Sequence, residues 1–125
     1  MADNTNRLAG IAYIAVNGQN YMLAGELVYS PGGITRESLP GQDRVHGYAE
    51  RPRPAFISGS FRDSGGLAVN DFNNMTNVTI TLQLANGKTV IGRNMWTVEA
   101  QEVHTPEATF EVRFEGFDGS VTEQM

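Results

Sequence analysis

The stretch that decides the fold runs from Thr79 to Glu99 and reads TITLQLANGKTVIGRNMWTVE. In its first half, apolar and polar side chains alternate strictly, which predicts a β-strand with one buried face. The apolar positions are Val78, Ile80, Leu82 and Leu84, and the polar positions between them are Thr79, Thr81 and Gln83. The pair Asn86-Gly87 favours a tight turn into a second strand. The stretch therefore predicts a β-hairpin.

The register of this hairpin has one difficulty. A two-residue turn would pair Leu82 with Ile91. That register places Arg93 on the apolar face opposite Ile80, where a charged side chain is not expected. We therefore expect a β-bulge or a strand break near residues 92–94, which would restore the pattern.

A second alternating strand is predicted near the C-terminus, in the segment ATFEVRFEGFDGS of residues 108–120. Its apolar positions are Phe110, Val112 and Phe114, and its polar positions are Glu111, Arg113 and Glu115. Two strands of the chain thus have one apolar face for a core and one polar face. What the polar faces contact is the functional question that the pattern raises.

Shorter signals complete the predicted elements. Asn17-Gly18, within the segment 8–27, favours a type I′ hairpin turn. A strand is expected over about residues 55–62, and Pro52 and Pro54 before it favour an extended entry of the kind that an edge strand tolerates.

A short helix is expected over about residues 66–75. Ala68, Phe72 and Met75 have the spacing of one helical face. Asp63 or Ser64 is the candidate N-cap. The asparagines in this segment have poor helix propensity, so the helix would depend on packing that face against a sheet.

The segment of about residues 28–50 has a different texture. Pro31-Gly32-Gly33 and Pro40-Gly41 interrupt any regular core strand. The segment is too long for an ordinary loop in so small a protein, so it is either an extended arm that reaches a neighbouring molecule or a flexible loop. The candidate inter-subunit residues of this arm are Tyr29, Ile34, Arg36, Glu37, Leu39, Asp43 and Arg44.

Composition limits the classes of protein that this chain can be. Its 125 residues fit one domain, and 14 Gly and 5 Pro between short apolar runs are typical of a mainly β fold. The absence of cysteine excludes disulfides and thiolate chemistry, as in a protein that folds in a reducing cytoplasm. No signal-peptide pattern or run of eighteen apolar residues is evident, so we expect neither secretion nor a membrane span. The net charge of −5 should repel nucleic acid, although ordinary solubility explains it equally well.

Catalytic and metal-binding motifs are not recognisable. His46 and His104 belong to no metal-ligand pair such as HExxH. Gly87-Lys88-Thr89 shares three letters with a phosphate-binding loop but lacks the upstream glycine and the following helix. No GxSxG motif occurs, and Glu111 with Glu115 is more typical of a solvated strand face than of an acid pair. We therefore expect no enzyme activity, metal, cofactor or small-molecule substrate.

Four segments carry a resemblance to a known family: GYAERPRPAFISG (47–59), NVTITLQLANGK (77–88), GRNMW (92–96) and TFEVRFEG (109–116). In this order, and over nearly the whole chain, the sequence resembles the tail tube proteins of Mu-like contractile-tailed bacteriophages and prophages. The resemblance implies one mainly β domain over residues 1–125, a β-sandwich or barrel-like tail tube fold with one short flanking helix and an extended loop arm.

The resemblance also implies a structural, non-enzymatic role in the virion. Such proteins form sixfold rings that stack into the inner tube of the tail, through which DNA is ejected without specific binding. The implied partners are further copies of the chain, the tail sheath, the tape measure, the baseplate initiator and the tail terminator, with assembly in the cytoplasm of the bacterial host. The alternatives are a tube subunit of a phage-derived injection device or type VI secretion system, and a monomeric β-sandwich module that binds a sugar or peptide.

If six copies join their sheets into a ring, one polar strand face lines the channel. The candidate lumen-facing residues are either Thr79, Thr81 and Gln83, or Glu111, Arg113 and Glu115. Alternation alone does not choose between the two sets. An acidic or neutral lining is expected because a cationic wall would bind the phosphates of the passing DNA.

Overall fold

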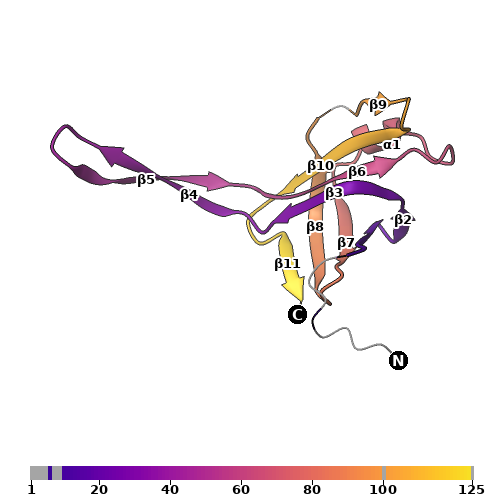
Figure 1. The fold of residues 1–125 in the computed structure, drawn as a ribbon, viewed down its shortest axis with the longest axis horizontal. Helices are drawn as coiled ribbons and strands as arrows, with labels where there is room; N and C mark the ends of the chain where they lie inside the picture. The colour runs from indigo at the N-terminus through magenta and orange to yellow at the C-terminus, as the bar shows by residue number, and fades with distance from the viewer. Residues whose placement is uncertain (1–5, 7–9, 100, 125) are drawn as a thin grey trace.

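The structure is a computed structural model that describes residue 6, residues 10–99 and residues 101–124. Two antiparallel sheets pack face to face, and one long hairpin projects from them (Figure 1). The elements in chain order are β1 (Tyr13–Val16), β2 (Gln19–Tyr21), β3 (Leu23–Ser30), β4 (Gly33–Pro40), β5 (Val45–Arg53), β6 (Ala55–Arg62), α1 (Asn70–Asn73), β7 (Val78–Gln83), β8 (Thr89–Thr97), β9 (Val103–His104), β10 (Thr109–Gly116) and β11 (Val121–Gln124). The mainly β prediction is confirmed.

The strand β8 belongs to both sheets. Its first residues pair with β7 and β11, and its last two, Trp96 and Thr97, pair with β10. Sheet A, as we name it, comprises β2, β1, β7, the start of β8 and β11. Sheet B comprises the end of β8, then β10, β6 and β3, with β9 against β10. The strands of the two sheets cross steeply in Figure 1, and β8 bends between them.

The β7–β8 hairpin forms as predicted, but the two-residue turn was wrong. Leu82 pairs with Val90 instead of Ile91. The backbone N–H of Leu84 donates to the carbonyl of Lys88 at 3.0 Å, which leaves a three-residue loop between them. A three-residue loop ends in a residue with positive φ, and Gly87 takes this position at +92°. The extra loop residue shifts the register by one position.

The predicted bulge is confirmed at Arg93 and Asn94. Ile80 lies opposite Gly92 and Val78 lies opposite Met95, so β8 holds one more residue than β7 between these pairs. Asn94 adopts a φ of +55°. The shifted register already takes the charged Arg93 off the face opposite Ile80 and leaves it exposed, and the bulge then brings Met95 instead of Asn94 into the core. The bulge lies where β8 passes from one sheet to the other.

The core lies between the sheets and is closed by aromatic rings. The apolar faces of β7 and β10 are buried as their alternation predicts. Phe72 of α1 packs edge-on against Phe61 of β6 and Phe110 of β10, with ring centroids 5.7 Å and 5.2 Å apart. Among the described residues, no polar or charged residue is buried. Stability therefore depends on apolar packing shared by both sheets.

The helix is shorter than predicted. It covers only Asn70–Asn73, follows Val69 as N-cap and has no side-chain cap. Asp63 instead accepts a hydrogen bond from the backbone N–H of Gly65 in a preceding turn, at 3.0 Å. Of the predicted helical face, Phe72 is buried, whereas Ala68 is exposed. Poor helix formers do not sustain a longer helix, so one buried phenylalanine positions a single turn.

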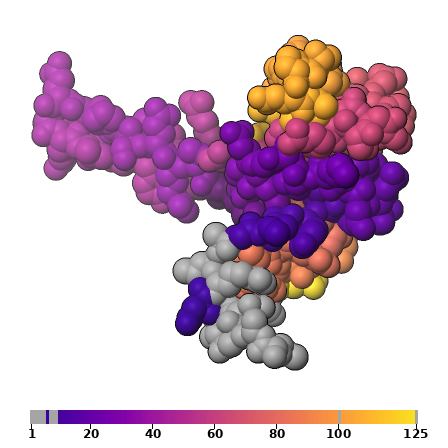
Figure 2. All heavy atoms as spheres, turned by 45° about the vertical axis from the view of Figure 1, so that its right-hand side comes forward, coloured from indigo at the N-terminus to yellow at the C-terminus, as the bar shows by residue number. Residues whose placement is uncertain are grey.

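The segment expected to be an irregular arm is a regular β-hairpin. β4 and β5 pair with each other from Gly33–Arg53 to Pro40–Val45 and form a separate two-stranded sheet. The hairpin continues β3 and β6 outward (Figure 1), and the space-filling view shows it standing clear of the rest of the molecule (Figure 2). We call residues 33–53 the arm and the rest of the described chain the body. Pro31 to Gly33 mark the root of the arm, and Pro40-Gly41 its tip.

Two further predictions, the Asn17-Gly18 turn and the strand at residues 55–62, have mixed outcomes. The Asn17-Gly18 turn between β1 and β2 is confirmed, with both residues at positive φ. Leu8 and Ala9 of that predicted segment lie outside the described residues. The strand at 55–62 is confirmed as β6, but it is not an edge strand because β10 and β3 pair with its two sides. Pro52 is tolerated because it lies in the arm, where β5 has a free edge.

Candidate assembly surfaces

The two predicted sets of lumen residues lie on opposite outer surfaces of the sandwich. Ile80 of β7 and Val112 of β10 both point into the core between the sheets. The side chains that alternate with them therefore point outward, each set from its own sheet. The set Thr79, Thr81 and Gln83 lies on the outer face of sheet A, and the set Glu111, Arg113 and Glu115 lies on the outer face of sheet B. The two sets cannot line the same wall.

The outer face of sheet B is hollowed. Residues from β3, β6 and β10, together with the segment after β8, line one hollow: Glu26, Val28, Ser58, Gly59, Ser60, Glu99, Gln101, Glu111, Val112 and Arg113. An adjoining hollow shares Glu26, Ser60 and Glu111 with it. The first hollow forms where β6 contributes only small residues, Ser58, Gly59 and Ser60, while the neighbouring segments contribute longer side chains. This surface is concave and polar.

This concave face is acidic. The guanidinium of Arg113 lies 4.0 Å from the centroid of the Phe56 ring, and its Nε is 2.9 Å from Glu115 Oε2. The positive charge is therefore already compensated within sheet B. Among the described residues, no ion pair involves Glu26, Glu99 or Glu111, the three carboxylates that line the first hollow. These three carboxylates therefore leave uncompensated negative charge on the outer face of sheet B.

The outer face of sheet A has a different character. Thr81 lies between Ala15 of β1 and Ile91 of β8, and Gln83 lies beside Tyr13. These side chains are uncharged, and Tyr13 is exposed. Thr79 is held at the start of β7, where its N–H donates to Asn17 Oδ1 at 2.9 Å. This part of the face is uncharged and suited to contact with protein, and the exposed Arg93 lies at its edge in β8.

Of the seven predicted arm residues, six lie in the arm and one does not. Ile34, Arg36, Glu37 and Leu39 belong to β4, and Asp43 and Arg44 belong to the tip between β4 and β5. Tyr29 is the exception, because it belongs to β3 of the body. At the tip, His46 Nε2 and Asp43 Oδ1 are 2.9 Å apart, and this hydrogen bond lowers the pKa of the Asp43 carboxyl.

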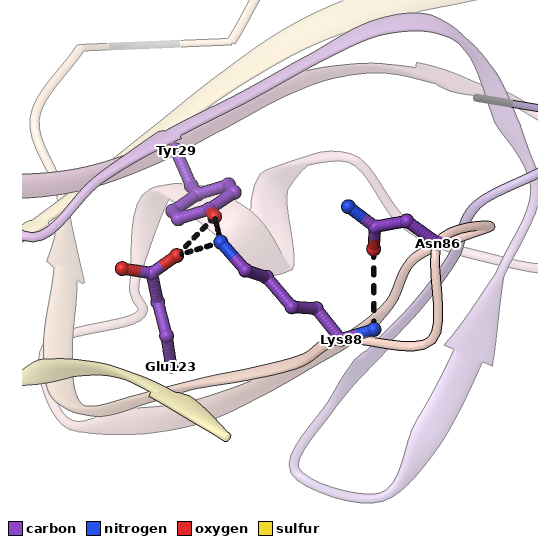
Figure 3. A network of polar contacts seen from close by, with 4 residues as sticks. All are labelled: Tyr29, Asn86, Lys88 and Glu123. Atoms are coloured by element: carbon purple, nitrogen blue, oxygen red, sulfur yellow. Dashed lines mark hydrogen bonds and ion pairs between the residues drawn. The ribbon is translucent and has the colours of Figure 1, made fainter. Parts of the chain in front are cut away.

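Tyr29 instead forms a polar clamp with Lys88 and Glu123 (Figure 3). Its hydroxyl donates to Glu123 Oε2 at 2.6 Å, and Lys88 Nζ donates to the same oxygen at 2.5 Å. Lys88 Nζ also lies 3.4 Å from the Tyr29 hydroxyl. The clamp joins the end of β3, immediately before the arm, to the start of β8 and to β11. It thus ties the arm root on sheet B to sheet A.

Sequence reasoning missed Lys88 and Glu123 as partners of Tyr29. They are 59 and 94 residues away from it along the chain, and no local pattern links them. The hydrogen bond from Lys88 lowers the pKa of the Glu123 carboxyl, and the same bond raises the pKa of Lys88. The hydrogen bond to Glu123 raises the pKa of the Tyr29 hydroxyl. All three shifts favour the charged lysine, the charged glutamate and the neutral tyrosine near neutral pH.

The clamp predicts a pH-dependent stability. Glu123→Gln keeps an acceptor for the Tyr29 hydroxyl but removes the charge, so we expect a lower urea midpoint than wild type at pH 7. Because the folded-state pKa of Glu123 is lowered, the carboxylate stabilises the fold above its usual pKa of 4.5, and this stabilisation disappears as the pH falls through the lower, folded-state value. The two midpoints should therefore converge in acidic buffer below that folded-state value. Gln124→Ala, next in β11, is the control, and an equal gap at both pH values would contradict a charged clamp.

Neither a metal centre nor a membrane-spanning helix is found in the described part of the chain. No group of three or more His, Cys, Asp or Glu residues there could hold a metal ion. No helix there is long and apolar enough to cross a membrane. Three surfaces of the described chain are candidates for contact with other molecules: the acidic face of sheet B, the outer face of sheet A, and the arm.

Comparisons with known proteins find relatives among tail tube proteins. The family model described as "Phage tail tube protein" matches residues 5–120 of this chain. The tail tube protein of Escherichia phage Mu is 30% identical over 94 residues, which cover 75% of this chain and 79% of that protein. The FluMu tail tube protein of a Mu-like prophage in Haemophilus influenzae is 30% identical over 90 residues, covering 72% and 75%.

Two solved structures have a similar fold. Hcp1 from Flavobacterium johnsoniae superposes with a TM-score of 0.58 at 13% identity, covering 92% of this chain and all of that one. The tube-terminating cap of the anti-feeding prophage superposes with a TM-score of 0.59 at 12% identity, covering 100% and 99%. At these identities the similarity concerns the fold alone.

Proposed function

Because this chain belongs to the phage tail tube protein family, we propose that it is the subunit of a hollow tail tube in which rings of six copies stack and viral DNA passes through the lumen. The role is structural, without catalysis or cofactor. The tube is a part of the virion and assembles in the host cytoplasm. The observation that carries the proposal is the concave, acidic outer face of sheet B.

The outer face of sheet B is the lumen wall in this proposal, and Glu111, Arg113 and Glu115 are its residues. A wall that neutralises phosphates releases counterions and gains affinity for DNA, which would arrest its passage. Glu26 and Glu111 offer charge of the same sign as DNA in both hollows, and Arg113 in the first hollow is already compensated by Glu115. Arg62 lines the adjoining hollow together with Glu107. The neutral set Thr79, Thr81 and Gln83 then faces outward.

The edges of sheet B support ring closure. β3 spans eight residues and, among residues 6, 10–99 and 101–124, pairs with β6 alone, so no described strand occupies its other edge. Two register shifts interrupt β3 near Gly25, a device that discourages uncontrolled pairing of an open edge. Joining this edge of β3 in each copy to sheet B of the next copy would close a continuous barrel.

The remaining partners follow from position in the tube. The arm contacts a neighbouring copy, and the neutral outer face of sheet A is available to the tail sheath. The tape measure occupies the lumen before DNA does, and the baseplate initiator and tail terminator bind the two ends of the tube. The named relatives are phage and prophage tail tube proteins, which favours a DNA conduit over an effector-delivery tube.

Negative-stain electron microscopy with sedimentation of the purified protein tests this proposal. Hollow rods or six-lobed rings are the expected result at high protein concentration, or after addition of the baseplate initiator. A species that remains monomeric at every concentration, with and without the initiator, would rule the tube out. Six-lobed rings that never stack would instead place the defect in ring-to-ring contact.

A further inference from the structure

The two faces of the arm differ in chemistry. Residues paired across β4 and β5 project to the same side, and successive pairs alternate between sides. One face, named here the Tyr48 face, carries the pairs Ile34–Pro52, Arg36–Glu50 and Ser38–Tyr48. The opposite face, named the Leu39 face, carries Thr35–Arg51, Glu37–Ala49 and Leu39–Gly47.

The Tyr48 face combines exposed apolar groups with a compensated charge. Ile34 and Tyr48 are 54% and 59% exposed. The guanidinium of Arg36 lies 5.8 Å from the centroid of the Tyr48 ring, and its Nε is 3.6 Å from Glu50 Oε1. Tyrosine and arginine are enriched among the residues that dominate binding energy in protein interfaces. Covering this face leaves no charge without a partner.

The Leu39 face would be costly to cover. Leu39 is 47% exposed, but Glu37 and Arg51 flank it. Within the described chain, no ion pair involves Glu37 or Arg51. Removing such charges from water without a partner opposes binding. Desolvation therefore favours the Tyr48 face as the one that is covered.

The charge distribution identifies what covers it. The arm holds four arginines and three carboxylates, so its formal charge is +1, while the rest of the chain carries −6. The Tyr48 face itself is neutral, because the excess positive charge lies with Arg51 and Arg53 on the opposite face of the arm. At long range the arm as a whole still attracts the body of another copy, whereas two bodies repel each other. A two-stranded hairpin is also marginally stable in water by itself, and both strands of the arm pair only with each other. Contact with a second copy supplies the missing support.

Resting on the tube assembly proposed above, we infer that the arm docks through its Tyr48 face onto the body of a second copy. Ile34, Arg36 and Tyr48 make the contact, and the Leu39 face stays in water. An eight-residue strand spans roughly 27 Å, enough to cross a neighbouring subunit of this size.

Two matched substitutions on β4 test the choice of face. Ile34→Ser and Leu39→Ser make similar changes at exposed positions of the same strand, on opposite faces. The critical concentration for tube formation, measured by sedimentation and electron microscopy, should rise about tenfold or more for Ile34→Ser and stay within about twofold for Leu39→Ser. Thermal unfolding of both variants confirms that the body is folded.

A second pair of substitutions controls for disruption of the arm hairpin itself. Arg36→Ala and Arg51→Ala each remove one arginine, from the Tyr48 face and the Leu39 face respectively. At high salt, where long-range attraction is screened, the first should impair assembly and the second should not. The inference is overturned if both members of a pair raise the critical concentration equally, or if the substitution on the Leu39 face raises it more. In that case, tubes formed by the wild type still support the proposed function. Failure of the wild type to assemble under any condition refutes the proposed function itself.

Discussion

Deleting the arm should leave a folded subunit that no longer forms tubes. The two strands of the arm pair with each other and with no strand of the body, so their loss removes no sheet pairing from sheets A and B. The break is easily closed, because the two sides of the arm root lie close together: a Cβ added to Gly32 would lie 2.7 Å from the backbone nitrogen of Ala55. Replacing residues 33–53 with a tight Asn-Gly turn is therefore the appropriate deletion.

The expected readouts separate folding from assembly. The unfolding midpoint of the deleted form should remain close to that of wild type, and sedimentation should show no tubes at concentrations many times the wild-type threshold. Mixed with wild type at a low ratio, it should also shorten the tubes, since an incorporated subunit cannot contact the next one. A variant with the arm replaced by a flexible Gly-Ser segment of equal length is the control for spacing. Long tubes from the deleted form would show that the arm is dispensable.

Reversing the charge of the proposed lumen wall should convert a passive channel into one that binds DNA. Glu26→Lys with Glu111→Lys changes two exposed carboxylates of the concave face of sheet B, neither of which has an ion-pair partner among the described residues. Each ring would then present lysines to the phosphates. We expect wild-type tubes to bind short duplex DNA undetectably, and the variant to bind it with an affinity that falls by about a thousandfold or more between 50 and 200 mM salt.

The opposite face provides the control for this experiment. Thr79→Lys with Gln83→Lys adds two lysines to the outer face of sheet A. DNA bound to that variant should be digested by nuclease because it lies outside the tube, whereas DNA bound to the Glu26 and Glu111 variant should be protected. Protection with the Thr79 and Gln83 variant instead would mean that sheet A, not sheet B, lines the lumen.

Much of the body was predictable because its signals are local. Alternation in β7 and β10 requires only neighbouring residues, and a one-residue error would expose a whole apolar face. A bulge near Arg93 was expected for a register that the chain does not adopt; in the observed register it brings Met95 rather than Asn94 opposite Val78 and into the core. The turn length was not predictable, because Asn86-Gly87 is compatible with both a two-residue and a three-residue loop.

The helix and the arm show where local signals fail. Ala68, Phe72 and Met75 have helical spacing, yet only Phe72 finds space between Phe61 and Phe110. The prolines and glycines of the arm suggested irregular chain, but they lie at its root and tip, where turns need them. Tyr29 could not be separated from the arm by its position in the sequence. Its partners come from the β7–β8 loop and from β11, far along the chain.

The sequence alone determined that this chain is mainly β, which side chains of each long strand are buried, and, through its resemblance, the tail tube family. These properties depend on neighbouring residues and on the order of segments. Only the tertiary structure decided that the two polar strand faces lie on opposite sides of one core, that Arg113 is compensated while Glu26 and Glu111 are not, and that Tyr48 and Ile34 share one side of the arm. Such properties depend on strand pairing and sheet packing between distant segments, which side-chain alternation does not encode.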